Sequence, residues 1–188
     1  MEKKYILTDD VIDFNSHTLH RIKAVRDFDC VKAGDLGGFI ESEKNLDHDG
    51  AAWVTGDARI FGDAVVSSAA VVSGDAVVSG DARVSGVAVV SGAARVTGDA
   101  WVTGVARIFG DAVVSGAADF AVISGFGRVF RTTTFFRCKD NLVRCQCGCF
   151  YGTVDEFRSK VRETHGSSKY AKEYLMIADL MELHFKED

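Results

Sequence analysis

Hydrophobic and polar positions follow a fixed six-residue pattern through the middle of this chain. Between Gly50 and Ala121, twelve consecutive hexads all place Ala at the third position. The fifth position is Val or Ile in eleven hexads and Phe120 in the last, and the first is Gly everywhere except Ser68. Because successive residues of a strand point to opposite faces, the Ala and Val columns should lie inside and the residue between them outside.

The Gly-Asp pair that opens many hexads is expected to form a corner. Glycine accepts unusual backbone dihedrals, and Asp is expected to bond nearby backbone amides. Three strands and three corners then close an eighteen-residue triangular coil, so residues 50–121 make four coils, roughly 19 Å tall at about 4.8 Å per rung. The repeat resembles the hexapeptide-repeat superfamily, which implies a left-handed parallel β-helix in a mainly β chain.

The three corner columns of this prism differ in charge. Two carry aspartates, namely Asp57, Asp75 and Asp111 in one and Asp63, Asp81 and Asp99 in the other. Stacked carboxylates repel by about 1 kcal/mol per pair in water, so a cation between them is an alternative to ordinary turn bonding. The third column has no charge: Ala51, Ala69, Val87, Val105.

An apolar edge follows from that uncharged corner and the outward residues beside it. Long apolar patches usually mark a contact, and the superfamily resemblance implies side-by-side packing of prisms. We expect a homo-oligomer, a trimer in preference to a dimer, through an edge made by Trp53, Val71, Val87, Val89, Trp101 and Val105. The alternative is that the chain's own C-terminal part covers this edge.

Residues 1–49 are expected to cap the first coil. Residues 5–7 and 19–25 are typical of short strands, with a turn at 13–16 and a glycine-rich bend at 34–38. Ile40 and Leu46 are six residues apart, which predicts a degenerate first turn of the repeat. A cap of this kind protects an exposed sheet edge from aggregation.

The repeat ends at Val122, and residues 122–188 are expected to form a small domain of a hairpin and two helices. Strands at 131–138 and 142–149 with a two-residue turn at Asp140-Asn141 would pair Phe136 with Cys145. Alternation then places four cysteines on one face: Cys138, Cys145, Cys147, Cys149. We favour buried cysteines under the helices and expect no cofactor, with a zinc site as the open alternative.

The opposite hairpin face is expected to be basic. In the same register Arg137 lies directly across from Arg144, an unfavourable pair unless an anion or acid neutralises it. The candidate residues for binding a ligand or partner are Arg128, Arg131, Phe135, Arg137 and Arg144. A phosphate, a nucleotide or an acidic protein patch suits this surface, and ordinary pairing with acids of the following helices is the alternative.

The two helices are indicated by capping residues and an apolar stripe. Thr153 to Glu156 is a capping box that opens a helix through about residue 164. Ser167 or Ser168 begins a second helix. Its apolar stripe is expected to pack on the hairpin: Tyr170, Tyr174, Ile177, Met181, Phe185.

Charge and composition limit the kinds of partner that the chain can bind. The formal charge of −5 argues against general nucleic-acid binding, and no apolar run reaches membrane-spanning length. The N-terminal residues do not resemble a signal peptide, so we expect a cytoplasmic protein with five free thiols.

Catalysis is not expected. Acyltransferases of the hexapeptide-repeat superfamily use a His near a loop inserted between coils, but these hexads contain neither His nor an inserted loop. His48, just ahead of the first hexad, is the one candidate base, and a lone His beside aspartates is most often structural. An acyltransferase that uses His48 stays as an alternative.

Flanking motifs suggest a narrower resemblance. Lys32-Ala-Gly-Asp-Leu-Gly-Gly-Phe-Ile-Glu41 precedes the hexads, and Cys147-Gly-Cys-Phe-Tyr-Gly-Thr-Val-Asp-Glu-Phe157 follows them. Together they resemble proteins encoded by bacteriophages and prophages, which implies the cytoplasm of a bacterial host. We therefore expect a non-enzymatic oligomeric scaffold that presents its C-terminal domain to a host partner, such as a defence protein or its nucleotide signal. A purely structural spacer is the alternative.

Overall fold

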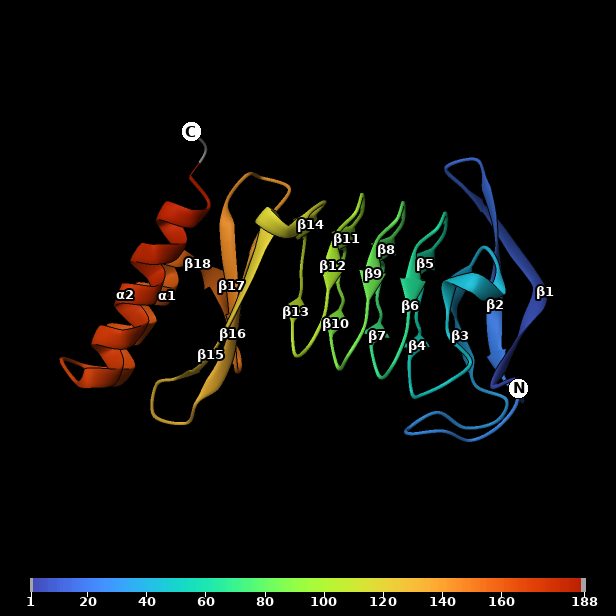
Figure 1. The fold of residues 1–188 in the computed structure, drawn as a ribbon, viewed down its shortest axis with the longest axis horizontal. Coiled ribbons are helices and arrows are strands. Elements are labelled where there is room, and N and C mark those ends of the chain that lie inside the picture. The colour runs from blue at the N-terminus through green and yellow to red at the C-terminus, as the bar shows by residue number, and fades with distance from the viewer. Residues whose placement is uncertain (1, 187–188) are drawn as a thin grey trace.

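The chain forms three units in a row, as a computed structural model of residues 2–186 shows. An antiparallel hairpin unit occupies one end, a parallel β-helix the middle, and a sheet with two helices the other end (Figure 1). The two termini therefore lie at opposite ends of an elongated molecule. Neither helix within residues 2–186 is long and apolar enough to cross a membrane.

The β-helix is built from two-residue strands, one per hexad. They are β4 (Trp53–Val54), β5 (Arg59–Ile60), β6 (Val65–Val66), β7 (Val71–Val72), β8 (Val77–Val78), β9 (Arg83–Val84), β10 (Val89–Val90), β11 (Arg95–Val96), β12 (Trp101–Val102), β13 (Arg107–Ile108) and β14 (Val113–Val114). The repeat alanines from Ala52 to Ala112 and the second residue of each strand are fully buried. The expected division into inner and outer positions is confirmed.

Strands eighteen residues apart pair in parallel and form the three walls of the prism. One wall has the order β13-β10-β7-β4 and another β12-β9-β6, while β5, β8, β11 and β14 belong to a seven-stranded sheet. Each rung donates its amides to the next, as in the bond from the Val71 amide to the Ala88 carbonyl at 2.9 Å. The predicted mainly β fold, a β-helix of about four coils followed by two helices, is confirmed.

The corners depend on glycine rather than on aspartate. Gly86 has φ 72°, and a Cβ there would lie 2.8 Å from the backbone N and O of Gly104 in the next coil. The expected bonds from corner aspartates to turn amides are absent among residues 2–186. The corner aspartates that have partners contact other side chains, as Asp63 does with Lys44 at 2.9 Å. The prediction for Asp was wrong: the amides of Asp57, Asp75 and Asp81 donate instead to glycine carbonyls of the next coil.

The N-terminal unit adds antiparallel strands to one wall. β1 (Tyr5–Phe14) pairs with β2 (His17–Ala24) around a turn in which Asn15 and Ser16 both have positive φ. β2 then pairs with β3 (Leu36–Ile40), which runs parallel to β5. The predicted bend at 34–38 is wrong in its second half. Gly37 and Gly38 belong to β3, and a Cβ on Gly38 would lie 2.7 Å from the Ala58 carbonyl oxygen.

The degenerate first coil is present. Ile40 pairs with Ile60 and Leu46 with Val66, so the inner Val and Ile positions continue into residues before the first hexad. The short 3₁₀ helix η1 (Glu43–Asn45) lies between them. The expected cap is therefore a partial coil that is itself covered by β1 and β2.

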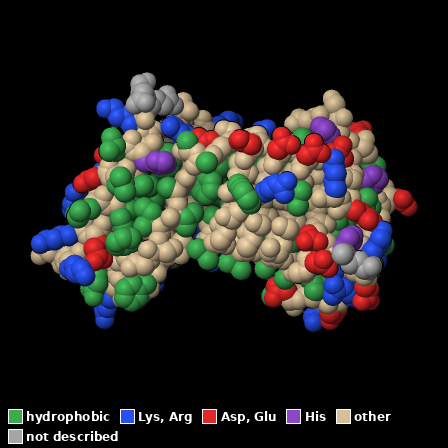
Figure 2. Space-filling model, viewed as in Figure 1, with side chains coloured by type: hydrophobic (Ala, Val, Ile, Leu, Met, Phe, Trp, Pro, Cys, Tyr) green, Lys and Arg blue, Asp and Glu red, His purple; other side chains and the backbone are tan. Residues whose placement is uncertain are grey.

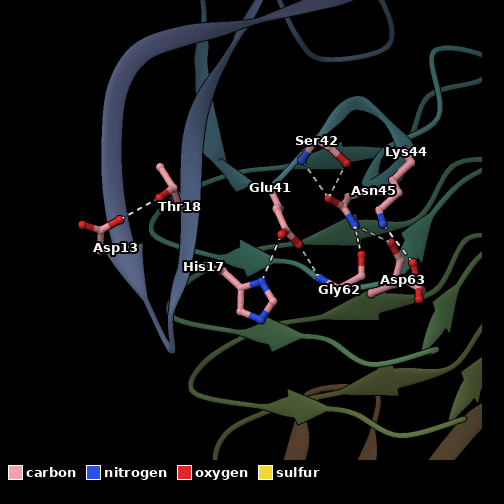
Figure 3. Close-up of polar contacts among 10 residues, drawn as sticks. Asp13, His17, Thr18, Glu41, Ser42, Lys44, Asn45, Gly62 and Asp63 are labelled. Atoms are coloured by element: carbon pink, nitrogen blue, oxygen red, sulfur yellow. Dashed lines mark hydrogen bonds and ion pairs between the residues drawn. The ribbon is translucent and has the colours of Figure 1, made fainter.

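A polar network holds this first coil in place (Figure 3). The buried Asn45 side chain donates to the carbonyls of Gly62 and Ala64 at 3.0 and 2.9 Å. Glu41 lies 3.0 Å from the His17 ring and accepts a hydrogen bond from the Gly62 amide at 2.7 Å. Both contacts lower the pKa of the Glu41 carboxyl. Glu41 and Asn45 thus have structural partners.

The C-terminal unit stacks on the last coil. Its antiparallel sheet has the order β15 (Phe120–Phe126), β16 (Arg131–Arg137), β17 (Val143–Cys147) and β18 (Phe150–Thr153), two strands more than expected. The last hexad leaves the coil through η2 (Ala117–Asp119). Phe136 and Cys138 join the core of the β-helix, and the Arg107 amide donates to Thr134 Oγ1 at 3.1 Å.

The hairpin register differs from the prediction by one residue. Phe135 pairs with Cys145 and Phe136 with Arg144, because the chain turns through Cys138 to Leu142 with Asn141 in the left-handed region, φ 63°. A three-residue loop of this type replaces the expected two-residue turn. Such a slip moves every side chain of one strand to the other face relative to its partner strand.

Both predicted helices are present and cover the far face of the sheet. α1 (Val154–His165) begins at the capping box of Thr153 and Glu156, and α2 (Lys169–His184) is capped by Ser168. Phe135 and Cys145 pack beneath them in a second core. Arg158 of α1 contacts Asp179 and Glu182 of α2, both at 2.8 Å, and joins the two helices.

Candidate functional site: a basic cavity in the C-terminal unit

A cavity of about 380 Å³ lies between the sheet and the two helices of the C-terminal unit. We call it the C-terminal cavity. It is lined by Arg128 and Val129 of the β15–β16 loop, Arg131 of β16, Cys147, Cys149 and Phe150 around the β17–β18 turn, Phe157, Lys160, Val161, Thr164 and His165 of α1, and Tyr174 of α2. These residues include three permanent cations and no carboxylate.

Arg131 is placed at this cavity by a glycine. Gly148 forms the β17–β18 turn with φ 61°, and a Cβ at this position would collide with the Arg131 guanidinium. The glycine therefore supplies both the left-handed backbone and the space across which Arg131 lies. This accounts for the central residue of the Cys147-Gly148-Cys149 motif.

Arg128 is held by contacts between its loop and α2. The Gly127 amide donates to Glu173 Oε2 at 3.0 Å, and the Tyr174 hydroxyl donates to the Phe126 carbonyl at 3.4 Å. Any Cβ on Gly127 would collide with that hydroxyl. The loop is thus fixed on the side next to α2, and Arg128 is presented at the cavity.

The two arginines have no internal counter-charge. Within residues 2–186, the side chains of Arg128 and Arg131 make no ion pair and no hydrogen bond. Lys160 differs, since it pairs with Glu163 at 3.0 Å on the surface of α1. An anion that enters the cavity would therefore meet two guanidinium groups without first displacing an acid.

The inner wall of the cavity is aromatic. Phe157 and Tyr174 are buried and meet edge to face, with centroids 5.7 Å apart. The His165 ring lies nearly parallel to Tyr174, at 5.7 Å and 28°. Burial raises the pKa of the Tyr174 hydroxyl, so this hydroxyl stays neutral at ordinary pH.

The structure separates the five residues predicted to bind a ligand. Arg128 and Arg131 line the cavity, but Phe135 is fully buried and packs edge to face on Phe157. Because of the one-residue shift, Arg137 and Arg144 lie on opposite faces, and the expected like-charge pair does not exist.

Both displaced arginines have structural contacts. Arg137 donates to the Phe185 carbonyl at 2.9 Å and lies 3.5 Å from Asp119. Arg144 forms two hydrogen bonds with Asp140, and these lower the pKa of that carboxyl to about 2. It also lies 3.7 Å from Asp111 of the last coil, which links the C-terminal unit to the β-helix. The sequence did not single out Lys160 and His165 as residues of the site. The predicted helix that begins at Thr153 placed both of them in or just after its last turns, and this was the signal that could have identified them.

The four hairpin cysteines do not share one face, contrary to the prediction. Cys138 packs in the core of the β-helix, whereas Cys145 packs under the helices and Cys147 and Cys149 line the cavity. All five cysteines are free thiols. No group of three or more potential metal ligands occurs among residues 2–186.

The predicted apolar edge is partly covered, and not by the C-terminal unit. Trp53 is 6% exposed because Tyr5 and Phe28 of the N-terminal unit pack on it, with centroids at 6.4 and 5.4 Å. Its assignment to an oligomer interface was therefore wrong. The remaining members stay at the surface, and we call them the apolar strip: Val71, Val87, Val89, Trp101, Val105. Trp101 is 64% exposed and Val87 56%.

The strip belongs to the β-helix, which is recessed between the two end units (Figure 2). Hydrophobic side chains border the lower edge of the central part, where the outline of the molecule is hollowed (Figure 2). Val87 and Val105 also line a second hollow of about 480 Å³ with Arg107, Arg131, Thr132 and Gly148. The strip therefore continues to the base of the C-terminal unit.

His48 is part of the N-terminal cap. Its ring stacks on Tyr5 at 4.3 Å, and its Nδ1 accepts from the Lys4 amide at 3.3 Å. The adjacent Lys4 is fully buried, and its ammonium donates to the Ala52 carbonyl at 2.9 Å. His48 does not line the C-terminal cavity.

Comparison with known proteins supports the repeat and nothing finer. A family model described as YdcK Beta solenoid repeat matches residues 58–74, which correspond to about one coil. The chain is thus similar to a β-solenoid repeat protein over that segment. No curated protein matches it significantly.

Proposed function

We propose that this β-solenoid protein is a non-enzymatic binding scaffold whose C-terminal cavity captures an anionic partner. One observation carries the proposal. Arg128 and Arg131 meet at one cavity without a carboxylate among its lining residues and without ion pairs of their own in residues 2–186. Two guanidinium groups that line one cavity without a counter-charge favour the binding of an external anion. The β-helix then acts as a rigid body that holds this unit away from the N-terminal cap.

The partner we propose is a molecule of a bacterial host. The motifs around Gly37 and Gly148 resemble those of phage and prophage proteins, and the task in this proposal is interference with host defence. A defence protein with an acidic patch and a phosphorylated signal molecule would both satisfy the two arginines. In this proposal the protein works in the host cytoplasm by binding, with no reaction at His48.

The test is capture from bacterial lysate with the tagged chain, followed by mass spectrometry of bound proteins and small molecules. The Arg128→Glu/Arg131→Glu variant should lose what the wild type captures. Arg95→Glu is the matched control, because Arg95 is exposed on a wall of the β-helix away from the cavity. A purely structural spacer would give the same capture profile for all three proteins.

We also propose that the apolar strip binds a second copy of this chain. Its valines lie on three successive coils, so two strips present side chains at the same spacing of about 4.8 Å and can pack against each other. The recess favours two copies that cross at their strips over three parallel prisms, whose end units would meet first. A dimer therefore replaces the trimer in this proposal.

Light scattering after size exclusion measures this association. We expect twice the chain mass of 20.3 kDa for the wild type and a monomer for Val87→Glu. Val113→Glu places the same charge on a half-buried residue of another wall and should leave the mass unchanged. A monomeric wild type would contradict the association.

A further inference from the structure

We infer that the C-terminal cavity is built for a phosphomonoester on a flat aromatic body, of about the size of a mononucleotide. This inference rests on the proposed function and deepens it by naming the ligand class. It follows from three properties of the cavity: where its charges lie, what its inner wall is made of, and how large it is.

The charges fit a phosphate group. Arg128 and Arg131 come from two ends of the β15–β16 loop, so their guanidinium groups reach the cavity from separate points of attachment. Guanidinium groups bind the oxygens of a phosphate through paired hydrogen bonds, and two of them match a dianion. Lys160 lies on the α1 side, where Glu163 already offsets part of its charge. The phosphate is therefore assigned to the two arginines.

The inner wall fits a planar ring. Phe150, Phe157 and Tyr174 supply aromatic surface, and Val161 adds an aliphatic side chain. His165 stacks on Tyr174 and lines the same cavity, so its ring offers a further flat surface. Aromatic rings attract one another at centroid separations of about 4.5–7 Å, and base stacking on such side chains is tolerant of base identity.

The size excludes a long ligand. About 380 Å³ is near the lower end of the roughly 300–1,000 Å³ range of small-molecule sites. One base, one sugar and one phosphate fit this range, whereas an oligonucleotide would extend into solvent. The net charge of −5 also opposes a long polyanion.

Calorimetric titration of the full chain tests the assignment. The probes are AMP, phenyl phosphate, adenosine and inorganic phosphate. We expect AMP and phenyl phosphate to bind at least about ten-fold more tightly than adenosine or inorganic phosphate, because only they engage both parts of the cavity. Arg131→Met should weaken AMP binding by about ten-fold or more, because it removes a charge-assisted hydrogen bond to the phosphate. Arg95→Met should leave it unchanged.

The outcomes separate this inference from the proposed function. If inorganic phosphate binds as tightly as AMP, or if Arg131→Met has no effect, the assignment of an aromatic phosphomonoester is wrong. If neither AMP nor phenyl phosphate binds while lysate capture still depends on Arg128 and Arg131, the ligand class is wrong and the binding function stands. If that capture is also independent of both arginines, both proposals fail. Circular dichroism of each variant establishes that it is folded.

Discussion

The stacking of glycine corners makes a sharp prediction about two residues of one column. Gly86 and Gly104 are eighteen residues apart and have φ 72° and 66°. A Cβ on Gly86 would lie 2.8 Å from the N and O of Gly104, whereas a Cβ on Gly104 would have nothing within 4 Å. The difference arises because the chain after Gly116 leaves the coil, so no further corner lies above Gly104. A Gly→Ala substitution can therefore be compared at a corner with a coil stacked on it, Gly86, and at a corner without one, Gly104.

The magnitudes follow from the local geometry. Alanine in the left-handed region costs about 1–2 kcal/mol, and the lower entropy of its unfolded chain offsets about 0.4–1 kcal/mol. Gly104→Ala should thus reduce the free energy of unfolding by about 1 kcal/mol. In Gly86→Ala the coils must also separate, which strains the 2.9 Å bond from the Val87 amide to the Gly104 carbonyl. Overpacking adds about 1–3 kcal/mol and the weakened bond about 1 kcal/mol, so the total is about 3–5 kcal/mol.

Urea unfolding of both variants and the wild type measures this difference. The wild-type chain already holds one residue with a Cβ in this column, because Ser68 lies there with φ 63°. Its corner is altered, and the amides of Ala51 and Ala52 both donate to its carbonyl. If Gly86→Ala and Gly104→Ala destabilise the fold equally, within about 0.5 kcal/mol, contact between stacked corners does not explain the glycine column.

Two further predictions concern the C-terminal unit. Arg144 holds the pKa of Asp140 at about 2, below its ordinary 3.8, so this pair stabilises the fold above pH 3.8 and its contribution is lost as pH falls through about 2. In acid unfolding, Asp140→Asn should not show this loss of stability near pH 2. A profile identical to that of the wild type would exclude a contribution of the Asp140–Arg144 pair to stability. Burial raises the pKa of Cys138 to about 11 and also raises that of Cys145. Native alkylation should therefore label the exposed Cys149 and spare these two, as peptide mass spectrometry would detect; equal labelling would contradict their burial.

The sequence was sufficient for the β-helix because one period sets every position. Ala52 and Val54 occupy inner columns for the same reason as Ala106 and Ile108, so a single inference applied to each coil. The partial coil at Ile40 and Leu46 was also predictable, since the same columns continue there. Helix capping at Thr153 was readable because its signal is local.

The C-terminal site was less predictable because it depends on one turn residue. Asn141 accepts a left-handed conformation, which lengthens the loop by one residue and changes the register of the hairpin. That shift placed Arg137 and Arg144 on opposite faces and moved Phe135 into a core. Sequence alternation alone cannot fix the register when both hairpin faces carry buried residues, as they do here.

The apolar edge shows a second kind of limit. The outward column of Trp53, Val71 and Val89 was correctly assigned from the period. Whether each member is exposed depends on the N-terminal segment, whose Phe28 comes from outside the repeat and covers Trp53. A repeat therefore predicts its own surface, and the segments beyond it decide how much of that surface is free.

In the proposed function, the host partner binds at the C-terminal cavity, and the β-helix does not contribute to that binding. Quantitative capture of the lysate partner tests it with two variants: Arg128→Glu/Arg131→Glu, and a chain that lacks residues 75–92, one full coil. We predict that the coil deletion keeps wild-type capture, because register and both end units are preserved, while the double substitution abolishes it. Capture that survives the double substitution and disappears with the coil would contradict the claim.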